Sequence, residues 1–430
     1  MMKAKVITLG CKVNQYESEA MLSSLLQHGF AAAEDKETAD VVILNSCTVT
    51  AESDRKVRQI FRRAKKDNPD AVMVLTGCMA QAFPEDARRL EEADIILGTS
   101  NRKRLVPDLL AFLSARQRII DIAPHTNDEK FENLNVENFT GRTRAFVKIE
   151  DGCNRFCSYC IIPYARGRVR SKPLEDLKAE LAGLGANGYK EVVLTGINLS
   201  AYGQEFGLHL CDAIEAACAT PGIERVRLGS LEPEQLSEDV IRRMAKQKKL
   251  CPQFHLSLQS GCDATLKRMN RHYTADEYRT IVRNLRAAFE NAAITTDIMV
   301  GFAGETDEEF AESLAFAEEI AFAKVHVFAY SRRPGTRAYD MGDQLTNAVK
   351  EARSHEMIRV TTVTQQAFFK AQIGRTEEVL FEREIQKGVC EGYSMNYTPV
   401  AVASGTSLAG EIRSVRIESC TDTHCMGVVL

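Results

Sequence analysis

The sequence predicts an α/β protein made of an N-terminal open parallel α/β domain, a central incomplete (β/α)6 barrel and a small C-terminal antiparallel β-barrel. Through the first two parts, continuous Val/Ile/Leu runs alternate with helical patterns, which is the order of buried parallel strands joined by crossover helices. From Gly374 the pattern changes to short alternating strands punctuated by glycine turns, which is typical of a small barrel. We therefore expect domains at residues 1–125, 139–370 and 371–430.

Length and composition limit the number of domains, the cellular compartment and the role of the cysteines. A chain of 430 residues is too long for one ordinary core. The sequence has no run of about eighteen apolar residues and no signal-peptide pattern, so we expect a cytoplasmic protein without a membrane partner. In a reducing compartment, its 13 cysteines are more typical of metal ligands, catalytic thiols and buried small residues than of disulfides. The net charge of -4 neither indicates nor excludes a nucleic-acid binder.

Three apolar runs in the N-terminal third each end in a small residue and a cysteine. The carboxyl ends of parallel strands share one edge of a sheet, where α/β domains bind their ligands, so we expect the three cysteines to converge. They would then form either an iron–sulfur cluster with one open iron or a zinc site completed by water. The alternative is that each cysteine is a small buried residue at a strand end. The runs are residues 4–11 with Cys11, 40–47 with Cys47 and 71–78 with Cys78.

A helix predicted at residues 52–66 is rich in cations. Such a run is typical of a solvated helix face, and it also fits a face that contacts phosphates, so both interpretations stay open. The cations are Arg55, Lys56, Arg58, Arg62, Arg63, Lys65 and Lys66.

The loop after the apolar run 145–149 holds Cys153, Cys157 and Cys160 in the spacing C-x-x-x-C-x-x-C. Three thiolates on one short loop can hold three irons of a cubic four-iron cluster and leave the fourth iron open for a ligand. A structural zinc ion would need a fourth ligand, and no further Cys or His follows Cys160 within a few tens of residues. The spacing therefore predicts an iron–sulfur cluster, with zinc as the alternative.

The central part alternates strand-like runs with helical patterns. Six such units fall short of the eight of a closed barrel, so we expect a laterally open barrel with its chemistry at the carboxyl ends of the strands. Polar residues at these strand ends are either capped turns or a cofactor site, in which glycines let the ligand approach the backbone. The candidates are Gly196, Asn198, Glu232, Gln259, Arg271 and Gly301. The expected strands are 145–149, 191–195, 225–229, 254–258, 295–300 and 324–330, and the expected helices are 173–186, 209–219, 233–246, 275–290, 308–320 and 347–369.

Taken together, these segments resemble the methylthiotransferases of the radical S-adenosylmethionine (SAM) enzymes. The resemblance rests on both cysteine triads and on Tyr159, the aromatic residue just before the third cysteine of the loop. Within the family, Lys12-Val13-Asn14 is similar to the branch that acts on threonylcarbamoyladenosine in tRNA. The matching motifs are residues 9–19, 45–50, 76–78, 152–168, 255–261 and 330–336.

The resemblance implies a radical SAM barrel that carries two [4Fe-4S] clusters, one on the loop cysteines and one on Cys11, Cys47 and Cys78. SAM would bind the open iron of the first cluster, beside Tyr159 and the polar strand ends, and its radical would remove hydrogen from C2 of the adenine. The second cluster would supply the sulfur. No side chain beyond the cluster ligands is expected to act in catalysis. The product would be a 2-methylthio derivative of N6-threonylcarbamoyladenosine next to the anticodon.

The resemblance also implies the partners. We expect a tRNA anticodon stem-loop and a low-potential electron donor protein, and a monomeric enzyme. Alternative substrates are isopentenyladenosine tRNA and a ribosomal-protein aspartate, and an alternative of another class is a zinc-dependent RNA-binding protein without catalysis. Ala303, Ala329 and Gly229 depart from the family pattern, which changes loop stiffness and gives no reason to expect lost chemistry.

Two regions are candidates for contact with RNA. Residues 371–430 resemble the TRAM domain, but five Lys or Arg side chains against eight Asp or Glu make this barrel acidic and a poor general phosphate binder. We expect it to read RNA locally or to serve as a structural cap. A basic segment beyond the loop cysteines is the better candidate for an anticodon-stem phosphate. Its predicted RNA-binding residues are Arg166, Arg168, Arg170 and Lys172.

Overall fold

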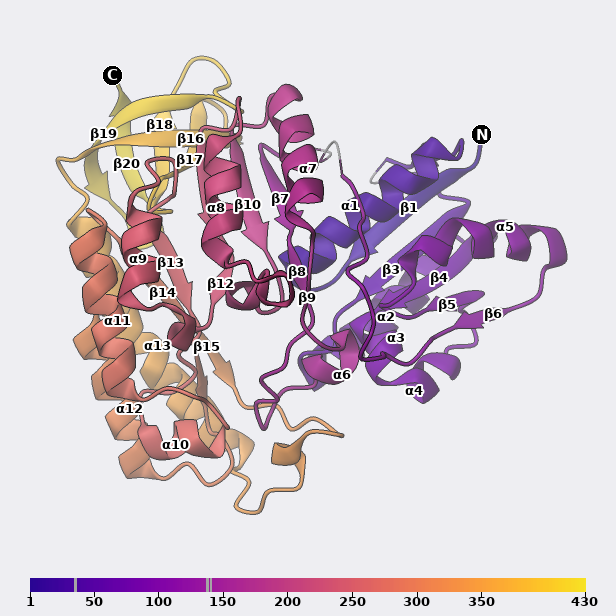
Figure 1. Ribbon diagram of the computed structural model, residues 1–430, viewed down its shortest axis with the longest axis horizontal. Coiled ribbons are helices and arrows are strands. Elements are labelled where there is room, and N and C mark those ends of the chain that lie inside the picture. The colour runs from indigo at the N-terminus through magenta and orange to yellow at the C-terminus, as the bar shows by residue number, and fades with distance from the viewer. Residues whose placement is uncertain (35–36, 137–138, 140) are drawn as a thin grey trace.

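The computed structural model describes residues 1–34, 37–136, 139 and 141–430, and it confirms the predicted three-part α/β architecture (Figure 1). The predicted start of the central domain, residue 139, lies beside residues 137, 138 and 140, which are outside the described residues. No helix within the described parts of the chain combines the length and the apolar character that a membrane span requires.

The N-terminal domain is a parallel sheet with the strand order β2-β1-β3-β4-β5-β6. Helices α1 and α5 pack on one face and α2, α3 and α4 on the other, which is why β3 and β4 are continuous, fully buried apolar runs. The strands are β1 (Lys3–Thr8), β2 (Ala31–Ala32), β3 (Val41–Ser46), β4 (Val72–Gly77), β5 (Ile95–Leu97) and β6 (Ile119–Asp121). The helices are α1 (Lys12–Gln27), α2 (Ala51–Asp67), α3 (Cys78–Ala82), α4 (Pro84–Arg88) and α5 (Leu105–Ala115), with a 3-10 turn at Arg102–Arg104.

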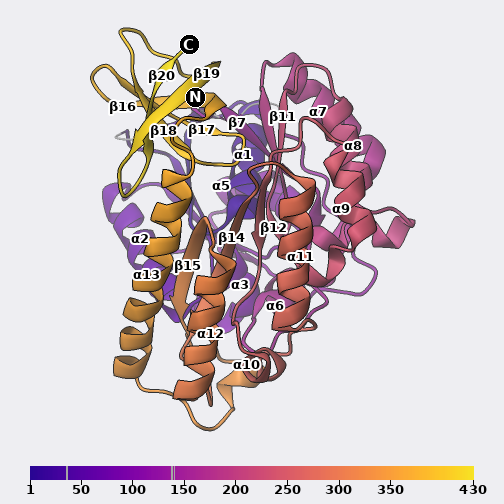
Figure 2. The ribbon, with the colours of Figure 1, turned by 90° about the vertical axis from the view of Figure 1, so that its left-hand side faces the viewer.

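The central domain is an open barrel of parallel strands. Its strands form a three-stranded sheet, β11-β10-β7, and a four-stranded sheet, β12-β13-β14-β15, which join where Gly229 separates β11 from β12. The helices follow one another around the outside, and the N-terminal domain lies against the other side (Figure 2). The strands are β7 (Arg144–Lys148), β10 (Glu191–Thr195), β11 (Arg225–Leu228), β12 (Ser230–Leu231), β13 (Gln253–Leu256), β14 (Ala293–Val300) and β15 (Lys324–Ala329). The helices are α7 (Leu174–Ala186), α8 (Leu210–Ala219), α9 (Glu238–Ala245), α10 (Asp263–Arg268), α11 (Ala275–Ala288), α12 (Asp307–Ile320) and α13 (Asn347–Lys370).

Short elements shape the mouth of this barrel. A two-stranded ribbon and the short helix α6 follow β7, and four 3-10 turns follow other strands. They are β8 (Glu150–Asp151), β9 (Arg170–Ser171), α6 (Ile162–Arg166) and the turns Leu199–Ala201, Gln204–Phe206, Pro233–Gln235 and Arg337–Tyr339.

The C-terminal domain is a closed five-stranded barrel in the order β16-β17-β18-β20-β19. Its pairings are antiparallel as predicted, except that β18 and β20 run parallel. Inward-facing apolar side chains of its strands fill the interior together with Phe369 from the end of α13. The strands are β16 (Thr376–Gln386), β17 (Val389–Ser394), β18 (Pro399–Ala403), β19 (Ile412–Cys420) and β20 (Cys425–Val429).

Candidate active site

Three cysteines lie together at the carboxyl edge of the N-terminal sheet, and we call them the edge triad: Cys11, Cys47 and Cys78. Their strands β1, β3 and β4 are neighbours, so the segments that follow leave the sheet side by side. A Cβ added at Gly10 would lie 3.1 Å from the Cβ of Cys47. Gly77 must be glycine, because its φ of 95° is left-handed and a Cβ would lie 2.5 Å from the backbone of β3. The structure thus brings together the cysteines that the sequence separates.

The other three cysteines, the loop triad Cys153, Cys157 and Cys160, lie between β8 and α6. Gly152 opens this loop with a φ of 84°, and a side chain there would collide with the backbone that leads to β9. From the opposite side of the barrel mouth, the amide of Asn270 donates hydrogen bonds of 3.3 and 3.1 Å to two carbonyl oxygens of the loop. The loop is therefore fixed by the ribbon at one end and by the barrel at the other.

Four of the triad thiols are set in surroundings that disfavour the free thiolate. Burial raises the pKa of Cys78 and of Cys160 to about 12, and it raises the pKa of Cys47 and Cys153 as well. A bound metal removes the proton outright, because it stabilises the thiolate far more than the apolar surroundings destabilise it. These side chains are built to carry metal rather than to act as free nucleophiles.

Cationic donors point at one sulfur of each triad. The Arg271 guanidinium donates to Cys157 Sγ at 3.3 Å, and the Arg166 guanidinium donates to Cys78 Sγ at 3.2 Å. A donor of this kind stabilises negative charge on the sulfur, and hydrogen bonds to cluster sulfurs are one means by which proteins tune such centres.

The spread of the sulfur atoms fits a cluster better than a single ion. All described cysteines are free thiols. Among the described residues, one group of His, Cys, Asp or Glu side chains has ligand atoms that all lie within 4.8 Å of one another. That group contains none of the triad cysteines, so the sulfur atoms of each triad are spread more widely. A tetrahedral zinc ion with bonds of about 2.3 Å would bring its sulfurs within about 4 Å of one another, whereas a cube binds each sulfur to its own iron.

A cavity of about 450 Å³ lies beside the loop triad, and we call it the active cavity. Cys160 and Met299 line it from the barrel mouth, and Val49 and Ser53 line it from the segment after Cys47. The loop triad therefore contributes Cys160 to the cavity wall, and the N-terminal domain contributes the segment that follows Cys47. A base bound in the cavity would contact both domains.

Of the predicted SAM-contacting residues, Tyr159 and Gln259 line the active cavity. Glu232 forms an ion pair of 2.5 Å with Arg271, which also reaches the loop triad. Asn198 is buried, and within the described residues its Oδ1 has no hydrogen-bond partner, so this oxygen is left for a ligand. Contact of these four side chains and Arg271 with SAM stays a prediction, and together they offer the donors and acceptors that its amino-acid and ribose groups need.

The two predicted glycines are explained by contacts within the chain. A Cβ at Gly196 would lie 2.6 Å from a carboxylate oxygen of Glu150, and a Cβ at Gly301 would collide with the side chain of Lys350. Contact of Gly196 and Gly301 with SAM stays a prediction.

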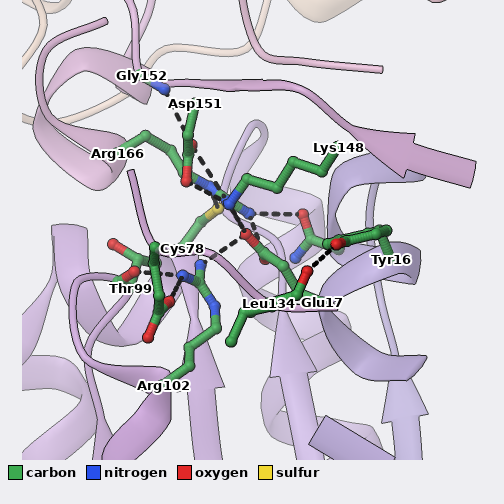
Figure 3. A network of polar contacts seen from close by, with 12 residues as sticks. Tyr16, Glu17, Cys78, Thr99, Arg102, Leu134, Lys148, Asp151, Gly152 and Arg166 are labelled. Atoms are coloured by element: carbon green, nitrogen blue, oxygen red, sulfur yellow. Dashed lines mark hydrogen bonds and ion pairs between the residues drawn. The ribbon is translucent and has the colours of Figure 1, made fainter. Parts of the chain in front are cut away.

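A buried ionic network joins the two domains between the triads (Figure 3). Glu17 of α1 forms ion pairs of 2.9 Å with Arg102, 2.5 Å with Arg166 and 2.7 Å with Lys148. Burial alone would raise the pKa of Glu17, but these three cations lower it to about 2. Because Lys148 ends the first barrel strand and also pairs with Asp151, the network fixes the cluster loop against the N-terminal sheet.

The prediction of RNA binding is wrong for three of the four residues named for it. Arg166, Arg170 and Lys172 are buried, at 0%, 5% and 0% exposure. Arg166 pairs with Glu17, Arg170 donates to the carbonyl of Arg166 at 2.6 Å, and Lys172 pairs with Glu180. A cation that is buried and already paired is not available to a phosphate. The reason for the error is that a charge pattern does not reveal which side of a turn faces another domain.

Arg168 is the member of the basic segment that stays exposed, with its guanidinium over the ring of Phe156 at 4.8 Å. The basic helix α2 also exposes its cations, with Arg55 and Arg63 side chains 61% and 83% exposed, while Val57 and Phe61 face the core. Arg168 follows the loop triad in sequence, and α2 follows Cys47 of the edge triad. Contact with RNA stays a prediction for both surfaces.

A second cavity, of about 460 Å³, lies inside the open barrel and reaches the C-terminal domain, and we call it the lumen cavity. Its wall includes Lys12, His255, Asp297 and His326. The ligand atoms of the last three lie within 4.8 Å of one another, and His255 Nε2 is 3.4 Å from Asp297. Burial, with Arg144 nearby, lowers the pKa of Lys12 to about 8.

Sequence reasoning noted Lys12 only as part of a family motif and did not predict that these four residues meet, although a signal for three of them exists. His255, Asp297 and His326 alternate with buried residues along β13, β14 and β15 and therefore share the inner face of the sheet. Lys12 gives no such signal, because it reaches the barrel from another domain.

Comparison with known proteins identifies two family profiles along the chain. Residues 3–98 match the uncharacterized protein family UPF0004, and residues 147–317 match the radical SAM superfamily. The chain is 36% identical to threonylcarbamoyladenosine tRNA methylthiotransferase MtaB of Bacillus subtilis (strain 168), over 95% of this chain and 92% of that protein. It is 37% identical to the protein of the same name from Thermotoga maritima, over 98% and 96%. It is also 34% identical to tRNA-2-methylthio-N(6)-dimethylallyladenosine synthase of Pelotomaculum thermopropionicum, over 100% and 98%.

A solved structure shares the fold. The radical S-adenosylmethionine methyltransferase TsrM from Kitasatospora setae, with cobalamin and a [4Fe-4S] cluster bound, superposes with a TM-score of 0.58 at 15% sequence identity. The match covers 78% of this chain and 74% of that one.

Proposed function

Because the chain belongs to the radical SAM tRNA methylthiotransferases, we propose that it adds a methylthio group to C2 of N6-threonylcarbamoyladenosine beside the anticodon of tRNA. The observation that carries this proposal is the active cavity, which is lined by Cys160 of the loop triad and by the segment that follows Cys47 of the edge triad. A base bound there would meet a radical source on one side and a sulfur source on the other. Relatives named for threonylcarbamoyladenosine support the choice of nucleoside.

We assign the cofactors to the residues that fit them. The loop triad would hold the [4Fe-4S] cluster that binds SAM, and the edge triad would hold the second [4Fe-4S] cluster. When bound, the clusters and SAM supply the radical that removes hydrogen at C2 and the sulfur and methyl group that take its place. The chain's own part is to hold the base in the active cavity and to position SAM through Asn198, Glu232 and Arg271.

The identity of the substrate is tested by nucleoside analysis. We expect tRNA from a deletion strain to lack 2-methylthio-N6-threonylcarbamoyladenosine and to accumulate the precursor, with restoration by the cloned chain. Loss of the 2-methylthio derivative of isopentenyladenosine instead would transfer the assignment to the branch of the dimethylallyladenosine relatives. A change confined to a ribosomal-protein aspartate would overturn the tRNA assignment.

The two-cluster assignment is tested by two cysteine variants. Cys157→Ser should abolish SAM cleavage, because it removes a ligand of the cluster beside SAM. Cys47→Ser should leave SAM cleavage in place and stop sulfur insertion. Methylthiolated RNA from the Cys47→Ser enzyme would contradict the assignment, and so would a zinc-containing, iron-free protein after anaerobic reconstitution.

The partners follow from this chemistry. The enzyme requires a low-potential electron donor protein and a tRNA anticodon stem-loop, and we propose that it acts as a cytoplasmic monomer. Arg168 and the cations of α2 are the exposed candidates for RNA phosphates.

A further inference from the structure

We propose that Lys12 binds the carboxylate of the threonylcarbamoyl group in the lumen cavity and so selects the substrate nucleoside. This inference rests on the proposed function and adds the recognition element for its substrate. The substrate class is an adenine whose N6 substituent ends in a carboxylate, in contrast to an uncharged N6 hydrocarbon.

Lys12 is a cation without a partner. Among the residues that the structure describes, its ammonium makes no hydrogen bond and no ion pair. The chain's buried lysines are treated differently: Lys148 pairs with Glu17 at 2.7 Å, and Lys172 pairs with Glu180. A cation that is partly removed from water and left unpaired is unfavourable unless a ligand brings the opposite charge.

The surroundings of Lys12 are cationic as well. Arg144 and Arg227 both act on its ammonium electrostatically, and the nearby carboxylate, Glu191, is already shared by Arg225 and Arg227. With Arg225, four cations at this end of the lumen cavity face two carboxylates, Glu191 and Glu382, which pair with the arginines. An anionic ligand group would supply the carboxylate that Lys12 lacks.

The position of the cavity suits a group attached to the reacting base. Asp297 lines both the active cavity and the lumen cavity, so the two spaces adjoin. With C2 of the adenine in the active cavity, a substituent on N6 can extend past Asp297 toward Lys12. His255 and His326 lie along that path, and with Asp297 they offer donors and acceptors to the amide and hydroxyl groups of the substituent.

The position of Lys12 in the sequence links recognition of the substrate to the edge triad. Lys12 is the first residue of α1 and directly follows Cys11 of the edge triad. The same helix start thus positions one ligand of the edge triad, Cys11, and one cation in the lumen cavity, Lys12. Recognition of the N6 substituent by Lys12 and delivery of sulfur at the edge triad therefore depend on two adjacent residues, Cys11 and Lys12.

The test compares RNA binding rather than turnover. Two anticodon stem-loop RNAs are needed, one with N6-threonylcarbamoyladenosine and one in which the threonine carboxylate is an amide. We expect the reconstituted wild-type enzyme to bind the carboxylate RNA at least about tenfold more tightly, since a hydrogen bond between an ammonium and a carboxylate is stronger than one to a neutral amide. Lys12→Gln should bind both RNAs equally and as weakly as the wild type binds the amide. Lys12→Arg should keep part of the preference.

The controls separate this inference from the proposed function. Lys178→Gln changes an exposed lysine of α7 and should behave as wild type. Unchanged iron content in Lys12→Gln shows that the edge triad still holds its cluster, and unchanged SAM cleavage shows that the loop triad is intact. If the wild type modifies threonylcarbamoyladenosine RNA but Lys12→Gln retains the preference for the carboxylate, the role of Lys12 is wrong and the proposed function stands. If the wild type neither binds nor modifies that RNA, both are wrong.

Discussion

Glu17 is the single residue on which the contact between the N-terminal domain and the barrel most depends. Its carboxylate is fully buried and is shared by Arg102, Arg166 and Lys148, which come from three separate segments. Bringing these charges out of water is unfavourable by itself, and the network is tolerated because every cation faces the same carboxylate. Removing that carboxylate leaves Lys148 and Arg166 with Asp151, and Arg102 with Glu132, as their remaining acidic partners.

We predict that Glu17→Gln lowers the free energy of unfolding by about 3 kcal/mol, the range for breaking a buried ion pair from one side. The loss should appear as a lower urea midpoint by circular dichroism. The matched control is Glu175→Gln, which breaks an exposed pair with Lys178 and should change stability by less than about 0.5 kcal/mol. Equal effects of the two substitutions would show that the network does not stabilise the fold.

Glu17 also makes stability depend on pH in a defined window. Its pKa is 4.5 in the unfolded chain and about 2 in the folded protein, so the folded state binds its proton less tightly. The stabilisation is therefore complete above about pH 4.5 and is lost as the pH falls toward 2. At about 1.4 kcal/mol per pKa unit, the window carries about 3.5 kcal/mol. The difference between the unfolding free energies of wild type and Glu17→Gln should shrink by about 1 kcal/mol from pH 4.5 to pH 3.5; parallel curves would refute the assignment.

The same network shows what a residue pattern leaves undetermined. The run from Arg166 to Lys172 reads as a basic RNA-binding stretch, yet three of its four cations face buried carboxylates and only Arg168 reaches solvent among them. One of those carboxylates, Glu17, lies almost 150 residues earlier in the chain. Charge patterns predict a surface only when no distant segment supplies the opposite charge.

At the scale of elements, the strands were predictable because burial imposes their composition. The run 191–195 coincides with β10, and the other central strands begin or end within two residues of the predicted limits. The cysteines at the strand ends could be predicted to converge because parallel strands share an edge. The break at Gly229 and the parallel pairing of β18 with β20 could not, since both depend on neighbours distant in sequence.

The cluster loop is an element whose shape depends on one glycine. Gly152 has a φ of 84°, and a Cβ there would collide with the carbonyl group of Arg168. We predict that Gly152→Ala displaces the loop triad and lowers SAM cleavage at least about tenfold, since a small displacement of a reacting group has a large effect on rate. The assay is the rate of 5′-deoxyadenosine formation by the reconstituted enzyme.

The control for this variant is Gly188→Ala. Gly188 has nearly the same φ, 86°, but nothing lies within 4 Å of an added Cβ. Only the backbone strain of about 1 kcal/mol remains there, so SAM cleavage should stay near the wild-type rate. Comparable losses in both variants would attribute the effect to strain in general rather than to the position of the cysteines.

At the scale of the whole molecule, the C-terminal barrel is docked through the floor of the central one. Arg225 and Arg227 at the start of β11 donate to backbone carbonyls of β17 and the turn after it, at 2.9–3.2 Å. Arg144 forms an ion pair of 2.5 Å with Glu382, and its guanidinium lies 5.2 Å from the rings of two stacked tyrosines. All three arginines converge on Glu191. The acidic barrel thus meets a cationic surface of the central domain, which its own composition did not reveal.

Glu191 orients these three arginines, and its removal should loosen the C-terminal barrel without unfolding it. Glu191 is buried, and its pairs with Arg225 and Arg227 are 2.9 and 2.8 Å long. In Glu191→Gln the guanidiniums lose their shared anion and repel one another, so the carbonyls of β17 lose well-directed donors. We predict faster hydrogen exchange in β17 and faster trypsin cleavage after Lys370, with exchange in β3 and β4 unchanged.

Glu224→Gln, which alters an exposed pair with Lys190, is the matched control and should match the wild type. Uniform acceleration of exchange in all three domains would mean that Glu191 supports the central core instead of the docking. A selective effect on the C-terminal barrel would also move the tyrosines of the lumen cavity wall, because Tyr393 and Tyr397 belong to it.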